Sequence, residues 1–548
     1  MKLFRAIGCL LLVVLVTTGC SRMEPTDLTA PTGGTGIPTP LAGTGSGFSN
    51  PLWEGADPYV IRHDGRYLFT HCDGHNSIYV SESQTLADRG PMTLAYRFPA
   101  GQWNSSLVWG PAALFRWEDG RWYMLYCAAD GPDLALNNPN HRLGVLRAIS
   151  DDPLGPYEDL TADAPLNSGG AWAIAAQPFQ DFEGNWYIAW SGWENQDSEF
   201  PQNTYIAPME NPWTIGDRVM ISTPDRIWER SIQPVQEGHM VLRREDRLLM
   251  FYSADASWTD NYSLGMLVYS GGDILDPASW VKHPQPVFYR TEKVRGPGGP
   301  AIVQSPDGTE DWLLYHAAQW PGSGWRRYVS AVRFTWDASG FPDFGDPVPY
   351  GQRMELPSGD PGLLPVDLYD CTWSSDRWFD WTTYGGEWTL SGGGTGRRYV
   401  LKGAETTAKS LVRSAVYRDL AMQCTVTLTS REAGTDAGLV FRATQPHVGQ
   451  NGLHGYYVAL DAGSGIVTLY RKTGRRAVEL GSGPMTLDRF VEYRIGVEAE
   501  GPTIRIFVED MANPLFEVED PVYREGAIGV CARGQGADWK QLESRSLD

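Results

Sequence analysis

Paired cysteines, positive charge and long apolar runs are scarce in this chain of 548 residues. Cys occurs seven times without a CxxC pair or zinc-ligand spacing, so neither a zinc ribbon nor a metal site is expected. The formal net charge of -21 repels phosphate backbones and argues against a nucleic-acid partner. A glycine-rich phosphate loop leading into a helix is also missing, and no cofactor is expected.

The first twenty residues contain the one clear targeting signal. Lys2 and Arg5 precede an apolar run, Ile7 to Val16, that is too short to cross a bilayer as a mature helix. The residues leading into Cys20 resemble a bacterial lipoprotein cleavage box, which implies a signal peptide over 1–20 and a lipid on Cys20. The alternative is an ordinary signal peptide cut nearby. We expect a secreted monomer of the bacterial cell envelope that contacts the membrane through this anchor alone.

The remaining chain divides into a tether, two domains and a linker. Residues 21–47 are rich in Thr, Pro and Gly, which is typical of a flexible tether. A large domain is expected over 48–356, followed by a linker rich in Gly and Pro and a second domain over 366–548. Gly (61) and Pro (38) are plentiful and helical patterns are few, so the sequence predicts an all-β protein.

The first domain repeats one unit five times. In each unit an apolar strand enters an acidic or Gly turn and an aromatic-rich strand returns, a pattern that predicts a hairpin. The returning strands are 67–69, 122–126, 186–190, 248–252 and 312–315. Hairpins recurring at roughly 55–64 residues leave room for five four-stranded sheets, which favours a five-bladed β-propeller over a sandwich of unrelated hairpins.

A propeller places the start of each innermost strand at its axis. The residues seven or eight positions before each turn are Asp57, Ala112, Ala175, Glu237 and Gly299. Two of them are carboxylates from different blades. Inverting glycosidases use such a pair, held roughly 6.5–9.5 Å apart, to activate water and to protonate the leaving oxygen.

Two motifs around these carboxylates carry a family resemblance. Gly55 to Val60 resembles the opening motif of glycoside hydrolase family 43, and Gln236 to Gly238 resembles its Asn-Glu-Gly-Pro motif. Stretches at 205–214, 275–280 and 341–345 are similar to its exo-acting α-L-arabinofuranosidase branch. The resemblance implies that Asp57 is the general base and Glu237 the general acid. It also implies inverting, exo-acting hydrolysis of α-L-arabinofuranosyl or similar pentosyl linkages in plant-wall polysaccharide.

Three of the five axis residues depart from the family pattern. Ala175 stands where the family has an Asp that tunes the acid, Ala112 where it has a Glu, and Gly299 where it has a channel His. Three interpretations stay open: a working hydrolase with a widened pocket, a weak or inactive protein that binds sugar, and a different cleavage chemistry at the same site.

Other candidate site residues follow from their positions. Trp53, Trp109 and Trp172 precede axis residues, so they are candidate substrate contacts, with packing between sheets as the alternative. Arg327, or its neighbour Arg326, is a candidate donor to substrate hydroxyls. His239 is a candidate substrate contact or substitute tuner, with a structural histidine as the alternative; the same ambiguity holds for the histidines at positions 71 and 75.

The second domain alternates short strands with turns, several of them Gly-rich. This pattern predicts a β-sandwich of the jelly-roll, concanavalin-like type. The stretches 437–442, 455–458 and 526–530 resemble sandwiches attached to glycosidases, including family 66 carbohydrate-binding modules. That resemblance implies sugar binding, with a domain that only braces the propeller as the alternative.

Overall fold

A computed structural model describes residues 47–131, 140–198, 200–363, 367–371, 380–393, 396–404 and 406–548. The predicted signal peptide, Cys20 and the predicted tether up to residue 46 lie outside these described residues, as does part of the predicted linker. The described chain is all-β, and its named helical segments are two 3-10 turns, η1 (Ile227–Glu229) and η2 (Pro277–Ser279). In the described ranges, no helix is both long and apolar enough to cross a membrane.

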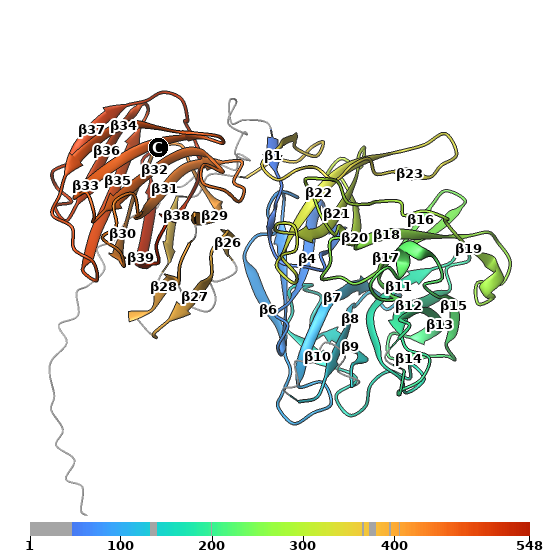
Figure 1. Cartoon of the computed structure of the whole chain (residues 1–548). Helices are drawn as coiled ribbons and strands as arrows, with labels where there is room; N and C mark the ends of the chain where they lie inside the picture. The colour runs from blue at the N-terminus through green and yellow to red at the C-terminus, as the bar shows by residue number, and fades with distance from the viewer. Residues whose placement is uncertain are drawn as a thin grey trace, which may run out of the picture. The chain divides into compact units, whose positions relative to one another are not determined.

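Five antiparallel sheets form the first domain (Figure 1). Blade I contains β3 (Tyr59–His63), β4 (Arg66–Cys72), β5 (Ser77–Ser83) and β6 (Met92–Arg97). Blade II contains β7 (Ser106–Arg116), β8 (Trp122–Ala129), β9 (Arg142–Ala148) and β10 (Tyr157–Asp159). Blade III contains β11 (Ala173–Gln180), β12 (Trp186–Gly192), β13 (Asn203–Asn211), β14 (Thr214–Ile215) and β15 (Val219–Ser222). Blade IV contains β16 (Gln236–Arg244), β17 (Arg247–Ala254), β18 (Ser263–Tyr269) and β19 (Trp280–Lys282).

The fifth blade joins the two ends of the domain. Blade V contains β20 (Gly298–Gln304), β21 (Asp311–Ala318), β22 (Arg327–Trp336) and β23 (Pro342–Asp343), with the early strand β2 (Trp53–Glu54) paired to β22. Outside the blades, β1 (Gly47–Ser49) pairs with β24 (Arg353–Glu355). The inner strands β3, β7, β11, β16 and β20 contact one another in a closed cycle that includes β20 and β3. The predicted five-bladed propeller is therefore confirmed.

The five predicted hairpins are the first two strands of each blade. The returning aromatic-rich stretches fall in β4, β8, β12, β17 and β21. Their turns adopt the left-handed backbone that Asp-Gly pairs favour, as at Asp64 (φ 48°) and Gly65 (φ 77°). Most of the aromatic side chains of these strands are buried, with Tyr123, Tyr252 and Tyr315 fully so, while Trp186 and Tyr187 are half-buried. Turn chemistry thus sets the hairpin, and the nearly continuous burial of the returning strands places both of their faces against neighbouring residues.

Four inner strands begin with the same irregular backbone. Asp57, Ala175, Gly238 and Gly299 have φ angles of 49°, 53°, 61° and 65°. In blades III, IV and V this left-handed residue coincides with a break in strand register. Such bulges re-aim the side chains around them, here at the axis of the propeller.

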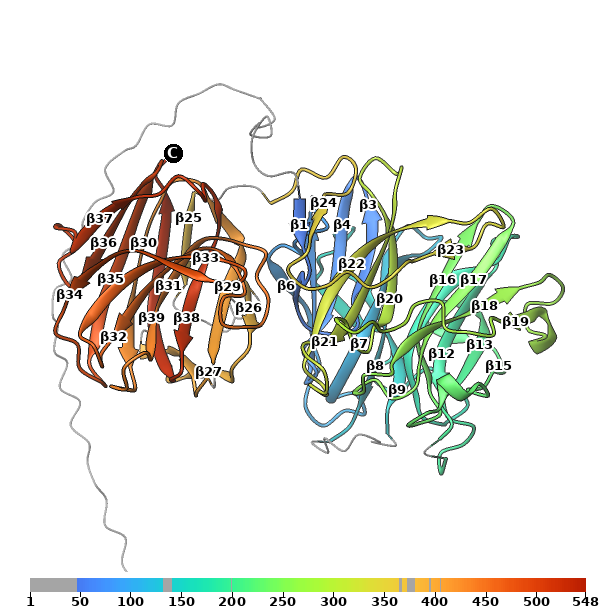
Figure 2. The ribbon, with the colours of Figure 1, turned by 45° about the horizontal axis from the view of Figure 1, so that its top comes forward.

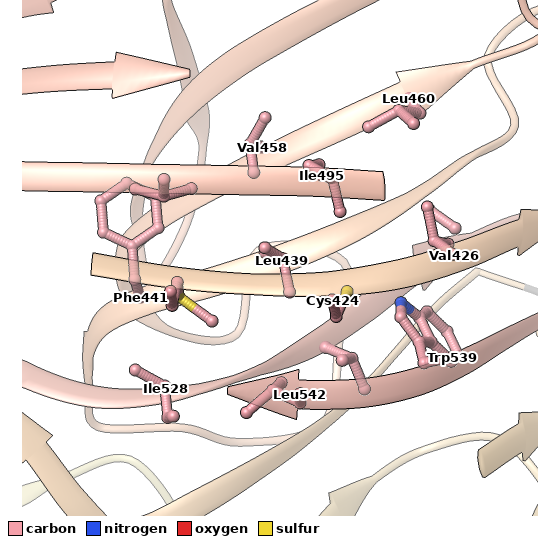
Figure 3. Close-up of a cluster of buried hydrophobic side chains, with 14 of the residues drawn as sticks. Cys424, Val426, Leu439, Phe441, Val458, Leu460, Ile495, Ile528, Trp539 and Leu542 are labelled. Carbon is pink, nitrogen blue, oxygen red and sulfur yellow. The ribbon is translucent and has the colours of Figure 1, made fainter. Parts of the chain in front are cut away.

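The second domain is the predicted β-sandwich (Figure 2). One sheet contains β25 (Leu368–Cys371), β27 (Trp388–Ser391), β28 (Arg398–Leu401), β30 (Leu420–Leu428), β35 (Glu492–Glu500), β36 (Thr503–Val508), β37 (Phe516–Glu519) and β39 (Ala537–Ser546). The other contains β26 (Trp381–Tyr384), β29 (Thr407–Tyr417), β31 (Asp436–Thr444), β32 (His454–Asp461), β33 (Ile466–Thr473), β34 (Ala477–Pro484) and β38 (Gly526–Arg533). Side chains from both sheets meet in one apolar core, with Ile495 and Trp539 from the first facing Leu439 and Val458 from the second (Figure 3).

Candidate active site

Asp57 is held at the axis by its backbone and by a neighbouring glycine. Its left-handed conformation is one that Asp tolerates better than most residues. A Cβ atom at Gly110 of blade II would approach the Asp57 Cβ to 2.9 Å, so this close approach requires glycine. The Asp57 side chain is about 30% exposed. Burial raises the pKa of Asp57, and the positive charge of Arg327 offsets part of that rise.

Glu237 is the second residue of β16, directly before the left-handed Gly238. The Tyr262 hydroxyl donates a hydrogen bond to Glu237 Oε1 at 2.9 Å. Burial raises the pKa of Glu237 to about 7 against the opposing effect of this bond, and the negative charge of Asp57 adds to the rise. About half of the Glu237 carboxyl groups are therefore protonated at pH 7, although the family's third carboxylate is absent.

His316 of β21 bridges Asp57 and Arg327. The backbone N–H of Asp57 donates to His316 Nδ1 at 3.0 Å, and Asp57 Oδ1 lies 3.4 Å from the same nitrogen. Arg327 Nη1 lies 2.9 Å from His316 Nε2. Burial and the charge of Arg327 hold the pKa of His316 well below its usual value, so the ring is neutral. A neutral imidazole has one acceptor nitrogen. The tautomer of His316 therefore decides which donor is bound, the Asp57 N–H at Nδ1 or Arg327 at Nε2.

Asp57 and Glu237 open into one cavity of about 540 Å³ at the axis. Five of the predicted site residues line it together: Asp57, Glu237, Trp109, Trp172 and Arg327. His71 also lines the cavity, and burial lowers its pKa to about 3, so it is neutral there. His75, in contrast, is exposed and is not part of the lining.

Two predicted substrate contacts do not line the cavity. The strand β2, which carries Trp53, belongs to the sheet of blade V. The Trp53 ring packs edge-on against the Phe69 ring, with the ring centroids 5.5 Å apart. His239 is 2% exposed, and its Nε2 lies 2.9 Å from the Thr204 hydroxyl oxygen. The bulge between Glu237 and Met240 breaks the strand alternation, so residues 237 and 239 no longer share a face. Burial lowers the pKa of His239 to about 3, so its ring is neutral. We therefore propose neither Trp53 nor His239 as a substrate contact.

Sequence reasoning missed several groups in the site. Tyr262 precedes β18 and His316 lies in β21, so neither belongs to the inner strands from which the axis residues were predicted. At the cavity mouth, Trp258 and Trp325 lie with ring centroids 5.2 Å apart, and Trp325 is 48% exposed. The segment Gln319–Arg327, which contains two tryptophans and two arginines and ends at the first residue of β22, was the available signal for this rim.

The residue before Glu237 is fixed by a buried polar network. Gln236 is fully buried, and its Oε1 accepts a hydrogen bond from the Thr204 hydroxyl at 2.8 Å. Its Nε2 donates to Glu229 Oε1 at 2.8 Å, and its backbone carbonyl accepts from the Ser191 hydroxyl at 2.7 Å. These bonds hold the start of β16 and thus the position from which Glu237 enters the cavity.

Glu229, at the end of η1, is the centre of this network and is fully buried. Besides Gln236, it accepts hydrogen bonds from the Tyr252 hydroxyl at 2.7 Å and from the Arg226 backbone N–H at 2.7 Å. Lys282 Nζ lies 3.0 Å from Glu229 Oε2 and also bonds the half-exposed Asp225 at 2.7 Å. The charge of Glu229 is thus paired and its oxygens are satisfied, as a buried carboxylate requires.

The three departures from the family pattern leave identifiable changes at the axis. Ala112 and Ala175 both line the cavity and are 1% and 3% exposed. A Cβ atom at Gly299 would approach His316 Nδ1 to 2.7 Å, so a histidine at position 299 is incompatible with His316 where it lies. The imidazole of His316 therefore lies beside the axis, but it comes from β21 and not from the inner strand β20.

Comparison with known proteins places this geometry among glycoside hydrolases. The model of glycosyl hydrolases family 43 matches residues 48–342. Alpha-L-arabinofuranosidase 43 of Humicola insolens is 32% identical over 315 residues, which cover 55% of this chain and 63% of that protein. An extracellular exo-alpha-(1->5)-L-arabinofuranosidase of Streptomyces avermitilis is 33% identical over 322 residues, which cover 56% of this chain and 64% of that protein.

The chain therefore spans a little under two thirds of the length of these two relatives. Among solved structures, an alpha-L-arabinofuranosidase from Lactobacillus brevis is similar, with 30% identity and a TM-score of 0.51. The match covers 55% of this chain and 98% of that one.

Proposed function

Because this chain belongs to glycosyl hydrolases family 43, we propose that it is an inverting exo-glycosidase that releases α-L-arabinofuranosyl or similar pentosyl residues from plant-wall polysaccharide. The observation that carries the proposal is the pairing of Asp57 with Glu237, whose pKa is about 7, in one axial cavity. The arabinofuranosidase names of the relatives support the choice of sugar.

Each carboxyl group suits one half of the reaction. Asp57, once ionised, removes a proton from water as that water attacks the anomeric carbon. Glu237 donates its proton to the departing glycosidic oxygen, which a group with a pKa of about 7 does efficiently at neutral pH. Trp109 and Trp172 offer aromatic faces to the sugar, and Arg327 offers hydrogen-bond donors to its hydroxyls. Trp325 at the mouth offers a further face to the rest of the oligosaccharide.

A second function, sugar capture without turnover, is favoured by Ala175 at the position of the family's third carboxylate. We expect purified protein to hydrolyse nitrophenyl α-L-arabinofuranoside and arabino-oligosaccharides, and to release arabinose from the chain end. A nitrophenyl xylopyranoside serves as the matched control. If none of these is hydrolysed while calorimetry still detects oligosaccharide binding, sugar capture is the function.

The pH dependence of kcat/KM is expected to be bell-shaped, with its alkaline limb near pH 7. Glu237 must be protonated, so activity is lost as pH rises through its pKa of about 7. Asp57 must be ionised, so activity is lost as pH falls through its own raised pKa. A pH profile of kcat/KM on an arabinofuranoside measures both limbs.

Ala175→Asp and Ala175→Asn make a matched pair for this profile. An added anion near Glu237 disfavours its ionised form, so Ala175→Asp is expected to move the alkaline limb to higher pH. Ala175→Asn adds a side chain of the same shape without charge and is expected to leave that limb in place. An alkaline limb that is the same in all three proteins would mean that Glu237 is not the titrating acid.

We further propose that the mature chain is secreted and anchored to the bacterial envelope by a lipid on Cys20. The motif before Cys20 supports the anchor, and a relative named extracellular supports secretion. Sugar binding by the β-sandwich domain stays a prediction. It is supported by the resemblance of its strands to carbohydrate-binding modules.

A further inference from the structure

The propeller has a second cavity at the end of its axis opposite the catalytic carboxylates. The inner strands β3, β11, β16 and β20 begin at the catalytic cavity and run away from it. Residues farther along these strands line a separate cavity of about 390 Å³, among them Arg62 of β3, Gln177 of β11, Leu242 of β16 and Gln304 of β20. We call it the far cavity. Its volume falls in the range of about 300–1,000 Å³ that is typical of small-molecule sites.

Positive charge is concentrated in the far cavity. Three arginines line it: Arg62 of β3, and Arg243 and Arg244 at the end of β16. Among the described residues that line it, the one carboxylate is Asp311 of β21. The lining is therefore net positive, whereas the whole chain has a formal net charge of -21. A cleft lined by one sign of charge concentrates ligands of the opposite sign.

Arg62 is held in place by backbone carbonyl groups. Its Nη1 donates to the carbonyl oxygen of Ser305 at 2.7 Å, and its Nη2 donates to that of Pro306 at 2.6 Å. These bonds orient the guanidinium group without neutralising it, because a carbonyl has no formal charge. Arg62 is also half-buried, so its charge has lost part of its water. An anionic partner offsets such a loss.

The two arginines of β16 keep hydrogen-bond donors free for a ligand. Arg243 Nη1 donates to the backbone carbonyl of Asp181 at 2.8 Å. Arg244 lies over the Trp336 ring, with its Cζ 3.9 Å from the ring centroid. Its Nη2 lies 4.0 Å from a carboxylate oxygen of Glu245, whose side chain is 78% exposed. A guanidinium group has five N–H donors, so most of those on Arg243 and Arg244 are left for other partners.

The carboxylate of Asp311 is bound by neutral groups. Trp336 Nε1 donates to Asp311 Oδ2 at 2.7 Å, and Gln304 Nε2 donates to Oδ1 at 3.4 Å. Within the described ranges, no ion pair joins Asp311 to an arginine of the far cavity. The three guanidinium groups therefore remain available to an oxyanion, and their planar fork fits a carboxylate.

The far cavity also presents apolar surface. Met240 and Leu242, two residues apart on β16, line it and are only partly buried. Trp336 of β22 is half-buried beside them. A small inorganic anion gains nothing from such surface, whereas the C–H groups of a sugar ring bury apolar area against it. A uronic acid has both a sugar ring and a carboxylate.

We propose that the far cavity binds a uronic acid, with the three arginines holding its carboxylate and the apolar side chains packing against its ring. The far cavity and the catalytic cavity share no lining residue, so both can be occupied at once. A polysaccharide that carries uronic acids would then be retained by the propeller while the catalytic cavity removes neutral side chains. The site itself goes beyond the proposed hydrolysis, and only its link to plant-wall polysaccharide rests on that function.

The test is calorimetric titration of the purified protein with D-galacturonic acid and D-glucuronic acid, each beside its methyl ester, and with inorganic phosphate. The methyl ester keeps the ring and removes the charge. For at least one acid, we expect one site per chain and a Kd at least about 10-fold lower than that of its ester, because hydrogen bonds between charged groups are the stronger ones. Phosphate buries no ring and is expected to bind at least about 10-fold more weakly than that acid.

Two double variants place the binding in the far cavity. Arg243→Gln with Arg244→Gln removes two of its charges and is expected to weaken acid binding by at least about 10-fold while leaving ester binding unchanged. Arg97→Gln with Arg121→Gln removes the same charge from exposed positions elsewhere on the propeller and is expected to leave both unchanged. Neither pair lines the catalytic cavity, so kcat/KM on nitrophenyl α-L-arabinofuranoside is expected to stay the same. Thermal melting of each variant confirms that it is folded.

The outcomes separate this inference from the proposed function. The uronic-acid site would be overturned if neither acid bound, or if the ester or phosphate bound as tightly as the acid. Acid binding that survives the loss of Arg243 and Arg244, or that both double variants weaken equally, would also overturn it. None of these results depends on turnover. Absence of hydrolysis on every arabinofuranoside, with acid binding intact, would overturn the hydrolase proposal and leave the site.

Discussion

Glu237→Gln is expected to lower kcat on arabino-oligosaccharides by about 10²–10⁴-fold, the contribution typical of a positioned general acid. Gln cannot donate the proton that the departing sugar oxygen requires. A dinitrophenyl leaving group is stable as an anion and needs no proton, so its release is expected to fall far less. Steady-state kinetics on both substrates give the ratio that identifies an acid.

Two variants complete this experiment. Asp57→Asn is expected to slow both substrates alike, because water must be activated whatever the leaving group. Glu245→Gln changes an exposed carboxylate at the turn of the same β16–β17 hairpin and is expected to leave both rates unchanged. Equal losses on both substrates for Glu237→Gln would contradict its role as the acid.

Glu229→Ala is expected to lower the free energy of unfolding of the propeller by about 3–5 kcal/mol. The substitution removes the acceptor of Tyr252, of Gln236 and of a backbone N–H. It also leaves Lys282, whose side chain is only 10% exposed, with a single exposed carboxylate partner. Urea denaturation followed by tryptophan fluorescence measures the loss.

Asp225→Asn is the matched control, because Asp225 is the other carboxylate on Lys282 and its side chain is 56% exposed. An exposed ion pair contributes about 0–1 kcal/mol, so this change is expected to be nearly silent. If the two variants lose the same stability, burial of Glu229 is not what makes it important.

The propeller could be predicted because its signals are local and repeated. Each Asp-Gly or acidic turn specifies a hairpin by itself, and the aromatic strands that follow are apolar enough to be buried along most of their length. Five such units at near-equal spacing leave little freedom for another arrangement. The sandwich followed from the same alternation, although its ligand did not, because strand patterns carry no information about a binding face.

The site was only partly predictable, for a physical reason. Asp57 lies just before β3 and Glu237 is the second residue of β16, and both keep their place in the repeat, so spacing alone found them. His239 was misplaced because a bulge after Glu237 shifts the alternation, and a bulge has no dependable sequence mark besides Gly238. His316 reaches the carboxylates from β21 and Tyr262 from the residue before β18, and these contacts exist only after the chain has folded.

The left-handed backbone at the inner strand starts bears on how this enzyme class can diversify. At Ala175 the main chain has the left-handed conformation that Asp57 has in blade I, although the side chain carries no carboxylate. Asp tolerates a left-handed backbone, so a carboxylate can be added at position 175 without remodelling the main chain. The charge at the axis can thus change through a side chain alone while the strand start keeps its conformation.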